Sequence, residues 1–254
     1  MSFDYSAAPI VRLAWERGLG LPKGALVSGT DSARITAERE NGGLTFLRLW
    51  NQAVLTGPAP LLQAASAFTD DELSDHATML RLSRDSGGRG GGTQTLYYAD
   101  DLPLRQPAST ITVSRGNPEA VALEALCPPD DVNDVGLRDL PYKFTLMDVT
   151  AQDFQADHDG EDPVGDGRPI ATSAYAEYQG LLAHLRTLVA PKHRGQGFGL
   201  LATNIAAHEA LADGLVLQWQ ADLNNAAAHT LAISTGFSVA GLLTSVALAH
   251  LPGH

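Results

Sequence analysis

A strand pattern, a glycine-rich loop and a helix pattern follow one another near residue 195, and this order constrains the fold most. The apolar run at 181–189 predicts a strand, and 198–212 carries apolar residues at helical spacing. Gly195, Gly197 and Gly199 stand between them, where glycine lets the backbone approach a ligand closely and adopt a positive φ. The first N–H groups of the helix are unpaired and carry the positive end of its dipole. The segment therefore predicts an anion site that suits a diphosphate.

A dinucleotide-binding fold starts from the same three elements and is the main alternative at this loop. The third glycine of its G-x-G-x-x-G fingerprint would come one residue later than Gly199 does here, and this loop opens with Arg194. That fold also needs an acidic residue at the end of a strand about twenty residues further on. Asp222 lies too far along the chain, and a helix follows it. Dinucleotide binding is therefore disfavoured.

From residue 106 onward, the predicted elements alternate between strands and helices, with two paired strands in the middle. This order favours a mixed α/β sheet as the fold class. The expected strands lie at 110–114, 142–149, 170–178, 181–189, 215–220 and 242–248, and the expected helices at 118–126, 198–212 and 226–235.

Residues 1–105 have a less regular pattern, and we expect them to pack on a domain formed by residues 106–254. The glycine run at 86–93 predicts a flexible loop, because it lacks the Gly-Lys-Ser/Thr ending of a phosphate-binding loop. The strands expected here are too few to form a stable sheet of their own. The predicted elements are a helix at 7–17, a hairpin at 44–55, a helix from a capping box at Thr69 to Leu82, and a strand at 95–99.

Two short motifs, separated by one helix and one strand, stand out within residues 181–238. The first is Arg194-Gly-Gln-Gly-Phe-Gly199, preceded by Val189-Ala-Pro191. The second is Asn225, followed three residues later by the small Ala228 and eleven residues later by Gly236-Phe237. Together they resemble the signatures of the GCN5-related N-acetyltransferase (GNAT) superfamily. The resemblance extends over about 108–250 at the level of fold and leaves residues 1–105 uncovered.

The resemblance implies transfer of an acetyl group from acetyl-coenzyme A to an amine. Pantetheine would pair with the backbone of Leu188 and Val189, and an N–H near Thr187 would stabilise the thioester oxyanion. Asn225 would line the pantetheine arm, although an ordinary role as a helix N-cap also accounts for it. The pyrophosphate would lie on the loop residues Arg194, Gly195, Gln196, Gly197, Phe198 and Gly199.

Two positions depart from the pattern of that family. Ala232 stands where many members carry a tyrosine that protonates the leaving thiolate, and Ala183 stands where some carry a glutamate or histidine that acts as the general base. The neighbouring His184 faces the other side of the strand. The remaining candidates for a general base are Glu177, expected to be partly buried, and Asp222. The alternative is an acyl-coenzyme A-binding regulatory module without turnover.

Charge and composition limit the partners. With 17 basic and 29 acidic residues, the net charge of −12 argues against a nucleic-acid partner and favours a small cationic amine. One cysteine excludes an internal disulfide and a zinc site built on several thiolates, so we expect no metal.

No run is apolar and long enough for a membrane helix and the first 30 residues lack a signal peptide, so we expect a cytoplasmic protein. The sequence leaves the oligomeric state open, with a homodimer as one option.

An acidic stretch at 148–166 contains no lysine and only acidic charges. A solvated loop is the simplest interpretation. A calcium loop starting at Gln155 would have Asp rather than Glu at position twelve and a proline inside it. A third option is an acidic lip that attracts a cationic substrate.

Overall fold

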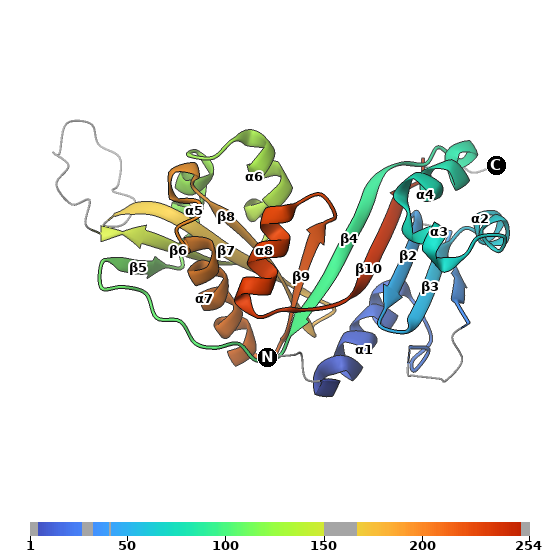
Figure 1. Ribbon diagram of the computed structural model, residues 1–254, viewed down its shortest axis with the longest axis horizontal. Coiled ribbons are helices and arrows are strands. Elements are labelled where there is room, and N and C mark those ends of the chain that lie inside the picture. Colours follow the sequence, from blue (N-terminus) through green and yellow to red (C-terminus); the bar gives the residue numbers. More distant parts are fainter. Residues whose placement is uncertain (1–4, 27–32, 41, 150–166, 250–254) are drawn as a thin grey trace. The chain divides into compact units, whose positions relative to one another are not determined.

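A computed structural model describes residues 5–26, 33–40, 42–149 and 167–249, which form two compact units (Figure 1). The motif unit consists of the described residues of Ala99–Trp219 together with Leu231–Phe237, and it contains the glycine loop. The composite unit consists of the described residues of Tyr5–Tyr98, Gln220–Thr230 and the segment from Ser238 onward. This interleaved division differs from the expected boundary after residue 105, because the last strand groups with the N-terminal region. Most of the acidic stretch, 150–166, lies outside the described residues.

The motif unit is built on a mixed sheet with the strand order β9-β8-β7-β6-β5. Neighbouring strands are antiparallel except β8 and β9, which run parallel. The hairpin between β7 and β8 turns at Gln179 and Gly180, which both have positive φ, as a tight hairpin turn requires. The strands are β5 (Ile111–Ser114), β6 (Tyr142–Asp148), β7 (Arg168–Tyr178), β8 (Leu182–Val189) and β9 (Val216–Asp222).

Helices cover both faces of this sheet. Neighbouring residues of β8 show the two faces, since Leu188 packs in a cluster with Leu123 and Leu137, while Val189 packs beside Ala202 of α7. The mixed α/β fold expected from the sequence is therefore confirmed. The helices of this unit are α5 (Asn117–Glu124), α6 (Pro129–Val135) and α7 (Phe198–Ala212). The helix α8 (Ala226–Thr235) is divided, with residues up to Thr230 in the composite unit and the rest in the motif unit.

The composite unit has the strand order β1-β3-β2-β10-β4. β10, the red strand of Figure 1, pairs antiparallel with β2 on one side and with β4 on the other. A strand from the C-terminal end of the chain thus lies between two strands from the N-terminal region. The elements are α1 (Ala8–Leu19), β1 (Ile35–Glu38), β2 (Leu44–Leu49), β3 (Gln52–Gly57), α2 (Ala59–Ala65), α3 (Asp70–Ser74), α4 (His76–Leu82), β4 (Arg89–Ala99) and β10 (Ser238–Ala247).

Two expectations for this region are wrong. From Arg89 onward the glycine run is part of β4 rather than a flexible loop, and a Cβ added at Gly91 would overlap the carbonyl oxygen of Ser245 in β10. Glycine in a strand commonly marks such a close backbone approach or a bulge, and the pairing of β4 with β10 has two irregularities. The helix from Thr69 is also divided in two, because Asp75 is extended between α3 and α4 and caps the second helix.

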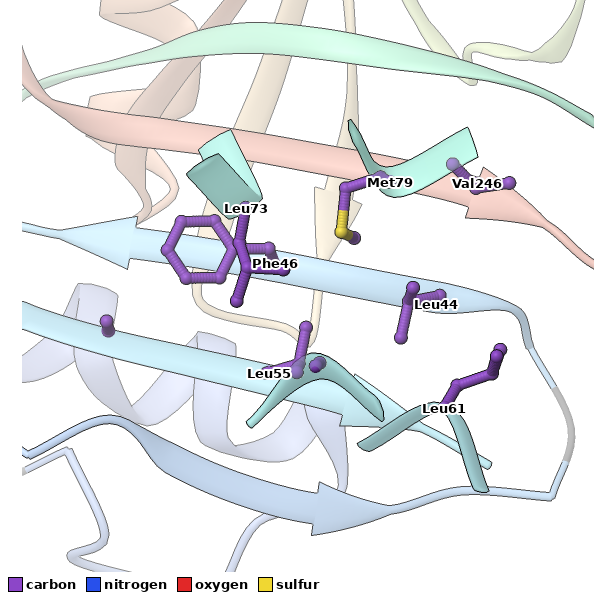
Figure 2. Packing of buried hydrophobic residues seen from close by; sticks show 9 residues of the cluster. Leu44, Phe46, Leu55, Leu61, Leu73, Met79 and Val246 are labelled. Carbon is purple, nitrogen blue, oxygen red and sulfur yellow. The ribbon is translucent and has the colours of Figure 1, made fainter. Parts of the chain in front are cut away.

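The hydrophobic core of the composite unit combines both ends of the chain (Figure 2). Leu44, Phe46 and Leu55 project from the β2–β3 hairpin, Met79 comes from α4, and Val246 comes from β10; each is at most 1% exposed. The hairpin expected at 44–55 is confirmed, and its turn includes Trp50 at a φ of 53°. Burying such side chains contributes about 1.5–3 kcal/mol each, so β10 is integral to this core.

Candidate functional site

The loop between β8 and α7 leaves room for a ligand beside its backbone. Gly195 and Gly197 have φ values of 73° and 87°, and no heavy atom lies within 4 Å of a Cβ built on either residue. Gly197 is the N-cap of α7, and no side chain caps this helix end. The first N–H groups of α7 therefore lack an intrahelical acceptor, and the space beside Gly195 and Gly197 is open, which is what an anion site at a helix N-terminus requires.

Gly199 has a different role from the other two glycines. A Cβ at this position would lie 3.1 Å from Cγ2 of Val189, which is tight for two carbon atoms. The residue thus allows close packing of α7 on β8. Gln196 is held by its own loop, because its Nε2 donates to the carbonyl oxygen of Lys192 at 2.8 Å.

Arg194 adds a positive charge to the glycine loop and also anchors the loop to neighbouring elements. Its Nη2 is 2.6 Å from Oδ2 of Asp131 in α6, and its Nε donates to the carbonyl oxygen of Val189 at 3.2 Å. Asp131 offsets the positive charge that the sequence assigns to phosphate binding. The sequence alone gave no signal for this partner, since Asp131 lies 63 residues earlier in the chain.

One edge of β8 is unpaired over its second half. The pairing with β7 runs along the whole strand, from Leu182 to Val189. The parallel pairing with β9 covers only Leu182–Leu185 opposite Val216–Trp219. Beyond Leu185, the backbone of β8 has no strand partner on the β9 side among the described residues, so an extended ligand can add there like a further strand.

Strand alternation determines which residues present their backbone at this open edge. The N–H of Ala190 donates to Ile170 on the β7 side, whereas the carbonyl of Leu181 accepts from Val216 on the β9 side. Backbone groups of successive residues point to opposite edges of a strand. Thr187 and Val189 hence direct their N–H and C=O groups to the open edge, where the carbonyl of Val189 already accepts from Nε of Arg194. The N–H and C=O groups of Leu188 are directed to β7. Of the two residues expected to pair with pantetheine, Val189 is the one in position to do so.

The side chain of Thr187 is fixed from both sides. Its Oγ1 donates to Ser173 at 2.9 Å and lies 2.7 Å from Oγ1 of Thr203 in α7. Thr203 is bonded in turn to the carbonyl of Gly199. These contacts connect the middle of β8 with the N-terminal part of α7, so the backbone of Thr187 is held close to the candidate anion site.

In the composite unit, Asn225 and Asp222 both have local structural roles. Oδ1 of Asn225 accepts from the N–H of Ala228 at 2.9 Å and caps α8, which leaves its Nδ2 able to donate to a ligand. Oδ1 of Asp222 accepts from the N–H of Asn224 at 3.0 Å. Both side chains belong to exposed residues.

The environment expected for Glu177 is wrong. The residue is exposed, and its Oε1 accepts a hydrogen bond from the hydroxyl of Tyr142 at 3.1 Å. It lies at the turn end of β7, where alternation places it on the same face as the buried Tyr175. Burial, together with a hydrogen bond to Asp213, raises the pKa of Tyr175 above its usual range, so that hydroxyl stays neutral.

His184 lies on the opposite face of β8 from Thr187, as its position in the strand predicts. Nδ1 is 3.2 Å from Oε1 of Gln218, and Nε2 accepts from Nε of Arg186 at 3.3 Å. Burial, together with the Arg186 charge, lowers the pKa of His184 to about 4. The imidazole is therefore neutral at pH 7 and takes part in a fixed network.

Two further features were not anticipated from the sequence. The hydroxyl of the buried Tyr97 lies 2.6 Å from Nδ1 of His229, within the composite unit. Nε1 of Trp219, at the last paired position of β9, is buried without a hydrogen-bond partner. Within the part of the chain that the structure describes, no three His, Cys, Asp or Glu side chains are grouped as a metal site requires, and no helix could span a membrane.

No protein-family model matches the sequence, and no curated protein matches it. Solved structures do resemble it. One is a GNAT-family protein from Novosphingobium aromaticivorans, with 16% identity, a TM-score of 0.45, and coverage of 64% of this chain and 67% of that one. A GCN5-related N-acetyltransferase from Kribbella flavida has 17% identity and a TM-score of 0.45, over 68% and 63%. A GNAT-family acetyltransferase from Colwellia psychrerythraea has 16% identity and a TM-score of 0.42, over 75% and 74%.

The match spans less than two thirds of the Kribbella protein. These likenesses concern the fold alone.

Proposed function

We propose that this protein is an N-acetyltransferase that moves an acetyl group from acetyl-coenzyme A to an amine. The observation that carries the proposal is the combination, within the motif unit, of an uncapped helix N-terminus and an open strand edge next to it. The first suits a pyrophosphate and the second suits the two amides of pantetheine. Open space at Gly195 and Gly197 is what close approach of a phosphate requires.

Each part of this unit has a definable task. The first N–H groups of α7 bind the pyrophosphate, and Arg194 orients the loop through Asp131. The backbone of Val189 pairs with pantetheine, and the N–H of Thr187 donates to the thioester oxygen, where negative charge develops during attack. Acetyl-coenzyme A supplies an activated acyl group with a thiolate as the leaving group. A free cysteine thiol has a pKa near 8.5, and a thiolate of this kind leaves with little assistance.

The acceptor is best sought among small cationic amines, since the chain has a net charge of −12. The test is incubation of the full-length protein with acetyl-coenzyme A and a panel of polyamines, aminoglycosides and amino acids. Release of coenzyme A and a mass increase of one acetyl group on one amine would support the proposal. A thermal shift with coenzyme A, and none with NAD or ATP, would support the site independently.

A second candidate is an acyl-coenzyme A-binding module without turnover. It is favoured by Ala183 and Ala232, which stand where the resemblance places a base and an acid and which are both fully buried. Tight binding of coenzyme A without its release from acetyl-coenzyme A in the presence of any amine would favour this candidate.

A further inference from the structure

The indole of Trp219 is an unused hydrogen-bond donor in the interior of the motif unit. The residue is 4% exposed, and its Nε1 has no partner among the described residues. Buried donors are nearly always paired, and a buried unpaired N–H destabilises the fold that contains it. An indole N–H can only donate, so the missing partner is an acceptor.

Strand register places this donor beside the open edge of β8. Trp219 is opposite Leu185 at the last rung of the β8–β9 pairing. In-register residues of parallel strands share a face, so Trp219 lies on the face of Leu185 and Thr187, which is the face covered by α7. Its ring also packs against the ring of Phe237, with a distance of 6.2 Å between the two centroids.

We propose that Nε1 of Trp219 donates a hydrogen bond to an amide carbonyl of the pantetheine arm, making Trp219 a binding residue for the acyl donor. The inference rests on the proposed function. Two independent observations agree on it, namely the ladder that stops at Leu185 and the orphaned donor at the same rung. A pantetheine amide along the open edge supplies both a donor for β8 and an acceptor for the indole.

The test compares two ligands and two variants by isothermal titration. The ligands are coenzyme A and adenosine 3′-phosphate 5′-diphosphate, which keeps the pyrophosphate and lacks pantetheine. Trp219→Phe should weaken coenzyme A binding by about 3- to 10-fold, the effect of one neutral hydrogen bond, and leave the nucleotide's affinity within 1.5-fold. Trp15→Phe is the matched control, because Nε1 of Trp15 already donates to Tyr98 at 2.6 Å. It should leave both affinities unchanged.

Equal affinities of wild type and Trp219→Phe for coenzyme A would overturn the inference, as would an equal loss for both ligands. Failure of the wild type to bind either ligand would instead remove the proposed function, and this inference with it. If Trp219→Phe does not fold, NMR of the wild type decides. The indole N–H resonance of Trp219, assigned by elimination with Trp15→Phe and Trp50→Phe, should move downfield with coenzyme A and stay in place with the nucleotide. No movement with coenzyme A would overturn the inference.

Discussion

The motif unit and the composite unit encode their structures in different ways. In the motif unit, the elements that form the proposed anion site follow one another within 182–212, and a short stretch of sequence specifies strand, turn and helix. In the composite unit, β10 pairs with β2 and β4 across about 150 to 200 residues of chain. Contacts of that kind leave no local pattern. A candidate binding site formed by neighbouring elements can therefore be predicted from the sequence even where the overall organisation of the chain cannot.

The largest effect on stability should come from separating the N-terminal part of the composite unit from β10. A fragment of residues 1–105 lacks β10, so β2 and β4 lose their shared partner and the core loses Val246. We expect this fragment to show no cooperative thermal transition by circular dichroism. The control is a protein in which a glycine–serine linker joins residues 1–105 to 236–254, so that β10 is present. It should regain part of the transition. A cooperative transition in the short fragment would mean that the N-terminal region folds on local information.

Next in size is a paired test on the two glycines that flank α7. Gly197 and Gly214 have φ values of 87° and 81°, and neither has a heavy atom within 4 Å of an added Cβ. Valine at either position brings similar backbone strain, on the order of 1–3 kcal/mol. Only Gly197→Val should abolish coenzyme A binding, with a loss above about 100-fold, because the branched side chain fills the anion site. Isothermal titration with thermal melts of both variants separates strain from binding, and normal affinity in Gly197→Val would refute the placement of the pyrophosphate.

Much of the motif unit follows from its sequence for this local reason. The helix expected at 198–212 and the hairpin at Gln179–Gly180 are confirmed, since helical periodicity and a positive-φ turn are properties of adjacent residues. The partner of Arg194 and the orphaned donor of Trp219 depend on contacts made only in the folded chain. The same limit explains the error at Gly91, where a flexible-looking run is required by the backbone of a distant strand.

A smaller effect should appear in the pH dependence of stability. The pKa of His184 falls from 6.5 to about 4 on folding, so the unfolded chain binds more protons between these values. Stability should therefore decrease as the pH drops from 6.5 to 4 and be unaffected by this group above 6.5. The full difference is about 3 kcal/mol at 1.36 kcal/mol per pKa unit. Urea unfolding of wild type and His184→Gln at several pH values measures it, and identical pH profiles would refute it.

The smallest effects should come from the two carboxylates first considered as general bases. Glu177 and Asp222 are exposed, and each already accepts a hydrogen bond, from Tyr142 and from Asn224 respectively. Because bulk water reaches both groups, neither has the desolvated setting that tunes a catalytic base, and water can take the proton of the amine directly. Glu177→Gln and Asp222→Asn should each lower kcat/KM by less than about threefold, against about 10²–10⁴-fold for a lost general base.

The wild-type kcat/KM should then rise with pH toward the pKa of the amine, near 10 for a lysine-like acceptor, without a plateau at neutral pH. A loss above 100-fold in either variant would assign the base to that residue, and a plateau below pH 8 would show that another group of the protein accepts the proton.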